Sequence, residues 1–386
     1  MSLNNIPPKK QIPLKWLICL SAVLLLIILA AGLRPKWFRF SNEVAWIADQ
    51  PGIRFSRFGI AFTNPFNNAI KESISAADGF SIEIALKPAS FHGHKFRFIL
   101  SFHNGDDSDQ FIMAQWLSDI IFMNGDDYDY TRKTKRITIN ADSASPAVRF
   151  VTISTGKEGT CVYVDGKPVR TKKDLRLIIP KGEKVRLLLG NSVYGKHHWR
   201  GDVYGLALYN YPLSQQDAGL HFNRWSNDRD FSFAANSKPI VLYLFDENGG
   251  TRALDHAGFG HHLEIPSRIQ IFKRSILAPP WKEFGFTRGY LLDVFVNLAG
   301  FIPFGFVLVA LLNRLGGIYT KRAVLITVAL CFMLSLSIEI IQSWIPSRSS
   351  HTLDLMLNTL GAWLGTYAYK FFSNELEKRK RFKPGV

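Results

Sequence analysis

The chain has 386 residues, a formal net charge of +16 and a hydrophobic content of 47%. This length allows two domains, and the many lysines and arginines beside apolar segments are typical of a membrane protein, so we expect no nucleic-acid partner. Cys161 is the single cysteine in the polar middle of the chain, which excludes a disulfide within that region. The sequence contains no G-x-S-x-G, H-E-x-x-H, phosphate-loop or zinc-cysteine motif.

The N-terminal part predicts a tail followed by a membrane anchor. Residues 1–15 are polar and basic and contain prolines, and residues 16–33 form a continuous apolar run long enough to cross a bilayer. A cleaved signal peptide is the alternative, but its apolar region would be unusually long, and further apolar segments follow. We therefore expect an uncleaved transmembrane helix over residues 16–33.

The middle of the chain predicts an all-β domain over residues 41–268. Hydrophobic and polar residues alternate in residues 80–87, which is typical of a half-buried strand. Asp165-Gly166 predicts the turn of a hairpin within residues 161–169. Many short strands at even spacing, with one short helical stretch after Ser214, indicate an antiparallel β-sandwich.

Four stretches of this region carry a resemblance: GFSIEIALKP, FIMAQWLSDIIF, CVYVDGKPV and LLLGNSVYGKHHWRGDVYGLALYNYPLS. They resemble the laminin-G-like domain, a concanavalin A-type jelly roll, over residues 42–225. The resemblance implies a jelly-roll sandwich and a carbohydrate-binding role. A further piece, residues 241–265, resembles the opening strands of the same family. It either completes the sandwich from the C-terminal side or serves as a linker, and both interpretations stay open.

Two similar acidic turns, at residues 104–109 and 124–129, interrupt the strands of the predicted sandwich. Oxygen-rich loops can hold Ca²⁺, but Asn-Gly and adjacent aspartates are also ordinary turn residues. We expect ordinary turns and keep Ca²⁺ as the alternative; no other cofactor is predicted. The candidate metal ligands would be Asp106, Asp107, Asp109, Asp126, Asp127 and Asp129.

The C-terminal part predicts three more transmembrane helices. Residues 269–289 form a basic, aromatic linker suited to a membrane interface, and apolar segments follow at residues 290–312, 323–345 and 353–372. Together with residues 16–33 they make four spans, and residues 373–386 form a basic tail. The basic excess over the short loops places both termini in the cytoplasm and the sandwich outside. Three residues oppose this orientation: Arg34, Lys36 and Arg39.

A few polar residues stand at regular spacing near the ends of these apolar segments. The pairs Asp293 and Asn297, Glu339 and Gln342, and Asp354 and Asn358 are three or four residues apart, so each pair occupies one helix face. In the four-span topology all of them lie at the same membrane depth, with Arg348 in the adjacent loop as the expected partner of Glu339. We favour a functional site over the alternative, an arginine-centred network that holds the helices together.

Three stretches of the C-terminal region carry a further resemblance: NLAGFIPFGF, SLSIEIIQSWIPSR and HTLDLMLNTLGAWLG. They resemble the VanZ-like membrane domain, a family named for an accessory protein of bacterial teicoplanin resistance. The resemblance covers residues 290–372 and implies that residues 16–33 supply the opening helix. Family loops often add acidic residues between the arginine and the aspartate, whereas residues 349–353 here are SSHTL, which weakens the case for a metal site.

These observations predict a multidomain protein of the bacterial plasma membrane, with a four-helix α-helical transmembrane domain and an extracytoplasmic β-sandwich. Its expected partners are the lipid bilayer and an envelope glycan, lipid headgroup or protein bound by the sandwich. The alternative is a membrane enzyme acting on a lipid-linked envelope substrate. In that case Glu339 or Asp354 would serve as acid or base, and Arg348 would hold an anionic group.

Overall fold

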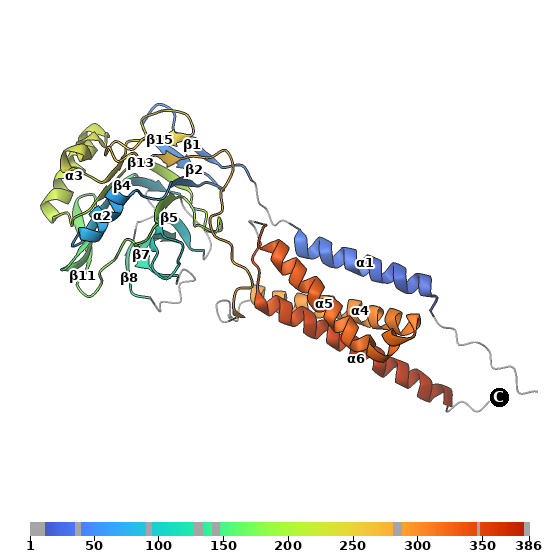
Figure 1. The fold of residues 1–386 in the computed structure, drawn as a ribbon. Coiled ribbons are helices and arrows are strands. Elements are labelled where there is room, and N and C mark those ends of the chain that lie inside the picture. The colour runs from blue at the N-terminus through green and yellow to red at the C-terminus, as the bar shows by residue number, and fades with distance from the viewer. Residues whose placement is uncertain are drawn as a thin grey trace, which may run out of the picture. The chain divides into compact units, whose positions relative to one another are not determined.

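The structure is a computed structural model that describes residues 12–34, 40–89, 95–126, 134–140, 147–280, 288–345 and 348–381. The chain divides into two compact units. Residues 38–273 form one unit, and residues 1–37 and 274–386 together form the other. Both units are drawn in Figure 1.

The first unit is a sandwich of two antiparallel sheets. One sheet has the order β1 (Val44–Trp46), β2 (Ile53–Phe55), β13 (Gly201–Tyr209), β4 (Phe80–Pro88), β9 (Arg149–Gly156), β10 (Gly159–Val164) and β11 (Lys167–Lys172), with β14 (Val241–Tyr243) paired to β13. The other has the order β15 (Arg252–Ala253), β16 (Leu263–Glu264), β3 (Ala61–Thr63), β12 (Arg186–Leu189), β5 (Arg97–His103), β6 (Phe111–Trp116), β7 (Asp119–Asn124) and β8 (Arg136–Asn140). The helix α2 (Asn68–Ala76) lies between β3 and β4 in the sequence.

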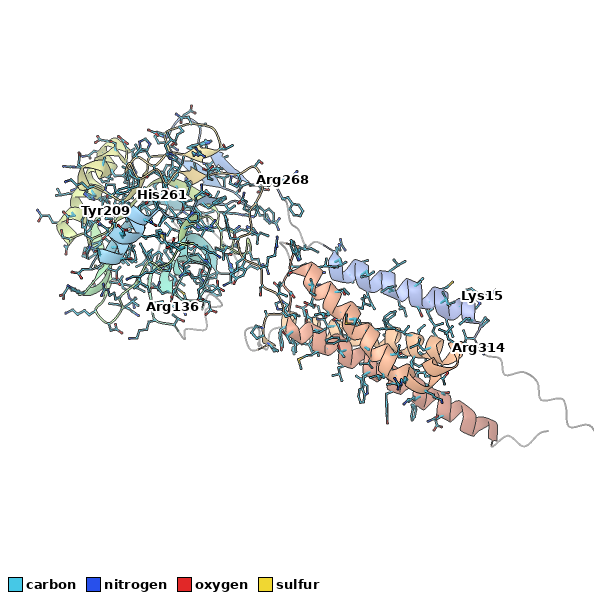
Figure 2. The ribbon with its side chains drawn as sticks, in the orientation of Figure 1. Lys15, Arg136, Tyr209, His261, Arg268 and Arg314 are labelled. Atoms are coloured by element: carbon cyan, nitrogen blue, oxygen red, sulfur yellow. The ribbon has the colours of Figure 1, made fainter. Side chains whose placement is uncertain are left out.

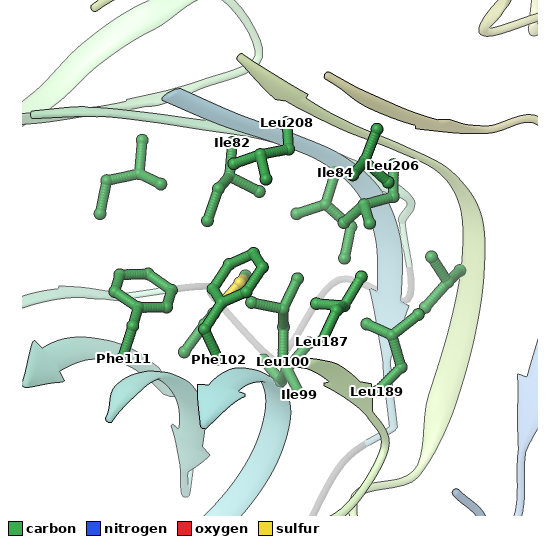
Figure 3. Packing of buried hydrophobic residues seen from close by; sticks show 14 of the residues in the cluster. Ile82, Ile84, Ile99, Leu100, Phe102, Phe111, Leu187, Leu189, Leu206 and Leu208 are labelled. Carbon is green, nitrogen blue, oxygen red and sulfur yellow. The ribbon is translucent and has the colours of Figure 1, made fainter. Parts of the chain in front are cut away.

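The core lies between the two sheets. Ile82 and Ile84 of β4 and Leu206 of β13 face Leu100 and Phe102 of the other sheet, as Figure 3 shows. The alternating pattern of β4 brings its hydrophobic side chains to this face.

The prediction that residues 80–87 form a half-buried strand is wrong in one respect. The outward face of β4 is also buried, including Glu83 and Ala85. A second apolar cluster packs there, with Trp225 of α3 (Gln215–Asp228) and Phe233 of the short 3₁₀ helix η1 (Ser232–Ser237). Because α3 and η1 cover the outer face of this sheet, the side chains on that face are buried too. The alternation of hydrophobic and polar residues therefore predicted more exposure of β4 than the structure has.

Residues 241–265 complete the sandwich, so the linker interpretation is wrong. The strand β14 pairs with β13, with Leu206 opposite Tyr243, and β16 pairs with β3, with Leu263 opposite Thr63. From the C-terminal side of the domain, one sheet therefore gains β14 and the other gains β15 and β16.

Both ends of the sandwich chain meet at one edge. Ser41 and Arg268 form an antiparallel bridge, and the backbone N–H of Ile269 donates to the carbonyl of Phe40 at 2.9 Å. Figure 2 labels Arg268 at this edge. The first and last residues of the sandwich therefore lie side by side.

The second unit contains the helices α1 (Leu14–Leu33), α4 (Arg288–Leu315), α5 (Ile318–Gln342) and α6 (Thr352–Arg381). Among the described residues, α1, α4 and Thr320–Gln342 of α5 are long and apolar enough to cross a membrane. Polar and small residues interrupt the apolar sequence of α6, so the count of four transmembrane helices stays a prediction for this helix.

The helices α4 and α6 pack with their backbones in contact. A Cβ atom added to Gly361 would lie 2.2 Å from the carbonyl oxygen of Leu298, and one added to Gly365 would lie 2.2 Å from that of Ile302. Contacts this short leave no room for any side chain. Small residues four apart in a helix are typical of such close packing.

Candidate functional site

The polar residues of α5 form one buried face of that helix. Ser335, Glu339 and Gln342 are 0%, 1% and 7% exposed, and their spacing of four and three residues aligns them along the helix. They lie in the last turns of α5, next to the loop that leads to α6. Polar groups so deeply buried in an apolar bundle need hydrogen-bond partners, so their partners indicate their role.

Two of the predicted site residues bind the C-terminal end of α1. Gln342 Nε2 donates to the carbonyl of Gly32 at 2.8 Å. The Arg348 guanidinium donates from Nε to the carbonyl of Arg34 at 3.1 Å and from Nη2 to that of Ala31 at 2.5 Å. The last carbonyls of a helix have no partner within it, so these side chains cap α1 and attach it to the loop between α5 and α6.

The expected ion pair between Arg348 and Glu339 is not formed in the described part of the chain. Glu339 Oε2 instead accepts a hydrogen bond from the backbone N–H of His351 at 2.8 Å. The carboxylate thereby holds the residue that immediately precedes α6. The guanidinium of Arg348 is planar and carries several N–H donors, so it can bind two neighbouring carbonyls at the end of α1. This geometry explains why Arg348 binds α1 and not Glu339.

The loop before α6 is also fixed from the other side, by residues that precede α4. The N–H of Leu277 donates to Ser350 Oγ at 3.0 Å, and the N–H of Ala278 donates to the carbonyl of Ser350 at 2.8 Å. The N–H of Thr352 returns a bond of 3.0 Å to the carbonyl of Ala278. A short parallel pairing thus joins the linker to the start of α6.

Two further bonds join α6 to its neighbours. Asn297 Nδ2 of α4 donates to Asp354 Oδ1 at 2.5 Å, and Asn358 Nδ2 donates to Ser335 Oγ of α5 at 2.9 Å. Asp293, one turn before Asn297, is exposed, and no described residue forms a hydrogen bond with its side chain. The structure therefore brings six of the seven predicted residues into contacts between helices, and it leaves Asp293 outside them.

The acidic turn at residues 104–109 is built around Asp107. Its Oδ1 lies 3.0 Å from His103 Nε2, and its Oδ2 accepts bonds from Tyr194 Oη at 2.5 Å and Lys273 Nζ at 3.0 Å. Burial would raise the pKa of Asp107, but the hydrogen bonds from His103, Tyr194 and Lys273 outweigh it and lower the pKa to about 2. Asp107 therefore links the turn to the end of the sandwich chain.

The structure describes three of the other candidate calcium ligands. Asp106 Oδ1 accepts the N–H of Ser108 at 3.0 Å, as in an ordinary Asx turn, and the side chains of Asp106, Asp109 and Asp126 are exposed. Asp127 and Asp129 lie outside the described residues. Ordinary turns stay the prediction here, with a calcium site as the alternative.

Sequence reasoning missed a group of possible metal ligands beside β14. One ligand atom from each of Asp246, Glu247 and His256 lies within 4.8 Å of the others. Asp246 is exposed, and exposed acidic groups of this kind are common without a metal. No motif spacing in the sequence marked these residues.

The protein thus consists of a unit of apolar helices joined by polar contacts and a β-sandwich whose sequence lies between α1 and α4. Residues 241–373 match the VanZ/LLP1 family model, and residues 66–219 match the model of the concanavalin A-like lectin/glucanase superfamily. The chain therefore has a VanZ-like region and a concanavalin A-like domain. The VanZ match begins at β14, so it includes the closing strands of the sandwich as well as α4, α5 and α6. The match and the apolar helices indicate a membrane protein.

The similar solved structures are distant. They include a receptor binding domain (15% identity, TM-score 0.39, 48% of this chain and 45% of that chain). They also include the binding domain of botulinum neurotoxin DC in complex with SialylT (13% identity, TM-score 0.38, 50% and 47%) and the receptor binding domain of botulinum neurotoxin D (15% identity, TM-score 0.37, 50% and 48%). This chain spans less than half of each of them, and likeness at this level carries no argument about a ligand. No curated protein matches the chain.

Proposed function

We propose that the protein is a membrane-anchored binding protein of the bacterial cell envelope. The helical unit holds it in the plasma membrane, and the sandwich recognises a glycan, a lipid headgroup or a protein outside the cell. The concanavalin A-like match of the sandwich supports a binding role. Both ends of the sandwich lie at one edge, and apolar helices flank the sandwich in the sequence, which supports a domain displayed by a membrane anchor.

The bonds from Arg348 to α1 favour an anchoring role over the alternative of a membrane enzyme. An enzyme acting on an anionic lipid would need this guanidinium for the substrate. Arg348 instead donates to two carbonyls of α1, and Gln342 donates to a third. Glu339 is 1% exposed and bonded to the backbone of His351, so it is not presented to a substrate. Together these contacts support a structural clasp.

Two variants of the full-length protein in detergent test the clasp. Removing the guanidinium in Arg348→Ala leaves helix-end carbonyls unpaired, and bonds to charged donors contribute about 1.5–3 kcal/mol each. We expect the Tm of the helical unit to fall by several degrees. Arg314→Ala removes an exposed arginine at the other end of the bundle and should leave the Tm unchanged. An unchanged Tm in Arg348→Ala would contradict the clasp.

Headgroup turnover separates the binding protein from the enzyme. The purified full-length protein would be incubated with lipids extracted from bacterial envelopes, and release of headgroups would be measured. We expect no turnover. Turnover that is lost in Glu339→Gln while the Tm stays unchanged would establish the enzyme instead.

Retention on isolated cell envelopes tests the binding role directly. We expect the full-length protein to be retained and a chain without residues 42–268 to pass through. Equal retention of both chains would place the binding surface outside the sandwich.

A further inference from the structure

The sandwich contains a cavity of about 460 Å³ where β2, β4 and β13 meet at one end of a sheet. This volume lies within the range of pockets that hold small ligands. The cavity is open to the surface, and its lining combines the apolar Phe55 and Pro88 with several charged residues, called the rim residues below. The charged rim residues are Arg54, Arg57, Lys87, Arg200, Glu43 and Asp202.

The two acidic residues of the rim are already bonded to the wall of the cavity. Asp202 forms a two-pronged ion pair with Arg54, at 2.7 Å from Nε and 2.9 Å from Nη2. Glu43 Oε2 accepts the backbone N–H of Arg57 at 3.1 Å. Lys87 and the Arg57 side chain form no ion pair with any residue that the structure describes. Positive charge therefore predominates at the mouth of the cavity.

A partly buried histidine, His198, lies near two arginines that line the cavity, Arg57 and Arg200. His198 packs edge-on against Phe58, with ring centroids 4.7 Å apart, and its neighbours include Arg57 and Arg97. Burial, followed by the charges of Arg97, Arg57, Arg200 and Lys95, lowers the pKa of His198 to about 4. Arg57 and Arg200 therefore act on His198 as well as lining the cavity.

We propose that this cavity binds an anionic group, a phosphate or a carboxylate, carried on a body the size of a sugar or of glycerol. Guanidinium and ammonium groups beside apolar lining residues are the chemistry that recognises such a ligand. The inference rests on the proposed binding function and names the ligand class for it. A lipid headgroup and an acidic glycan share this chemistry, so both are sources of the ligand.

Titration calorimetry on the full-length protein in detergent tests the proposal. The probes are inorganic phosphate, glycerol 1-phosphate, glucuronate, and the dihexanoyl forms of phosphatidylglycerol and phosphatidylcholine. The variant Arg57→Gln/Lys87→Gln removes two rim charges and leaves the ion pair of Arg54 in place. Its matched control, Lys167→Gln/Arg170→Gln, removes the same charge from exposed positions of β11, at the opposite edge of the same sheet.

We expect at least one anionic probe to bind the wild-type protein, with an affinity that falls as salt is raised. The rim variant should bind at least tenfold more weakly at unchanged Tm, and the β11 control should bind within twofold of wild type. Binding of phosphatidylglycerol but not phosphatidylcholine or glucuronate identifies a lipid headgroup as the source. Binding of glucuronate but neither lipid identifies an acidic glycan.

Two results would overturn the cavity as the site: no anionic probe binds the wild-type protein, or both double variants weaken binding equally. Retention on cell envelopes distinguishes this failure from that of the binding function. If the rim variant is retained as well as wild type, the cavity is not the site and the binding role stands. If the wild-type protein is not retained, the binding role itself is wrong.

Discussion

At the scale of single residues, the partner of a buried polar group determines its role. Glu83 is fully buried, yet its carboxylate accepts bonds from Tyr209 Oη at 2.9 Å, His221 Nδ1 at 2.9 Å and Thr152 Oγ1 at 3.2 Å. His221 Nε2 in turn lies 3.0 Å from Ser237 Oγ. These partners come from strands and helices far apart in the sequence, and together they compensate the loss of water around the charge.

His198 should make the stability of the sandwich depend on pH. Its pKa of about 4 in the folded protein lies below its value of 6.5 when unperturbed. As the pH is lowered, His198 is therefore protonated in the unfolded chain before it is protonated in the folded protein. The free energy of unfolding is not reduced by His198 above about pH 6.5, and it falls as the pH is lowered toward 4. We expect His198→Gln, whose amide oxygen can still accept from Asn191 Nδ2, to lose less stability over this interval.

The measurement is denaturant unfolding of the full-length protein at several pH values, followed by the circular dichroism of its sheets. Burial lowers the pKa of His197 to about 3, and this residue contributes to the pH dependence of stability in both proteins. Identical pH dependence of the two proteins would show that His198 is not responsible.

At the scale of secondary-structure elements, glycines determine how closely α4 and α6 approach. Gly365→Ala would force the two backbones apart, and overpacking of this kind destabilises by about 1–3 kcal/mol. Gly300 lies in α4, where an added Cβ atom would meet nothing within 4 Å. Gly300→Ala should therefore gain helix propensity and stabilise the bundle by about 0.5–1 kcal/mol.

Thermal unfolding in the same detergent tests whether the two substitutions change the stability in opposite directions. We expect a lower Tm for Gly365→Ala and an equal or higher Tm for Gly300→Ala. A fall of the same size in both would mean that loss of flexibility, and not the contact between helices, accounts for the effect.

At the scale of the whole molecule, the orientation in the membrane follows from the charge of the short loops. We expect both termini in the cytoplasm and the start of α6 outside. Cysteines would be introduced singly at Ser349 and Ser373, in a background without Cys19, Cys161 and Cys331. An impermeant thiol reagent added to intact cells should label position 349 and not position 373. The reverse pattern would invert the topology.

The sequence by itself determined the kinds of element and their order. Apolar runs marked the helices, short alternating segments marked the sandwich, and regular spacing placed Glu339 with Gln342 and Asp354 with Asn358 on single helix faces. These features are local, because the periods of helices and strands are expressed within a few residues of one another. The four-residue spacing of Gly361 and Gly365 is likewise a local pattern, and it is typical of a helix contact.

Tertiary structure alone decided which groups meet. Gln342 and its acceptor Gly32 are 310 positions apart, and no local pattern indicated that Arg348 would bind α1 instead of Glu339. The cavity proposed to bind an anion is assembled from β2, β4 and β13. Residues 241–265 could be placed in the sandwich only once their partner strands were known. Hydrogen bonds and charge pairs depend on distance in space, and folding sets that distance through packing between segments that are remote in sequence.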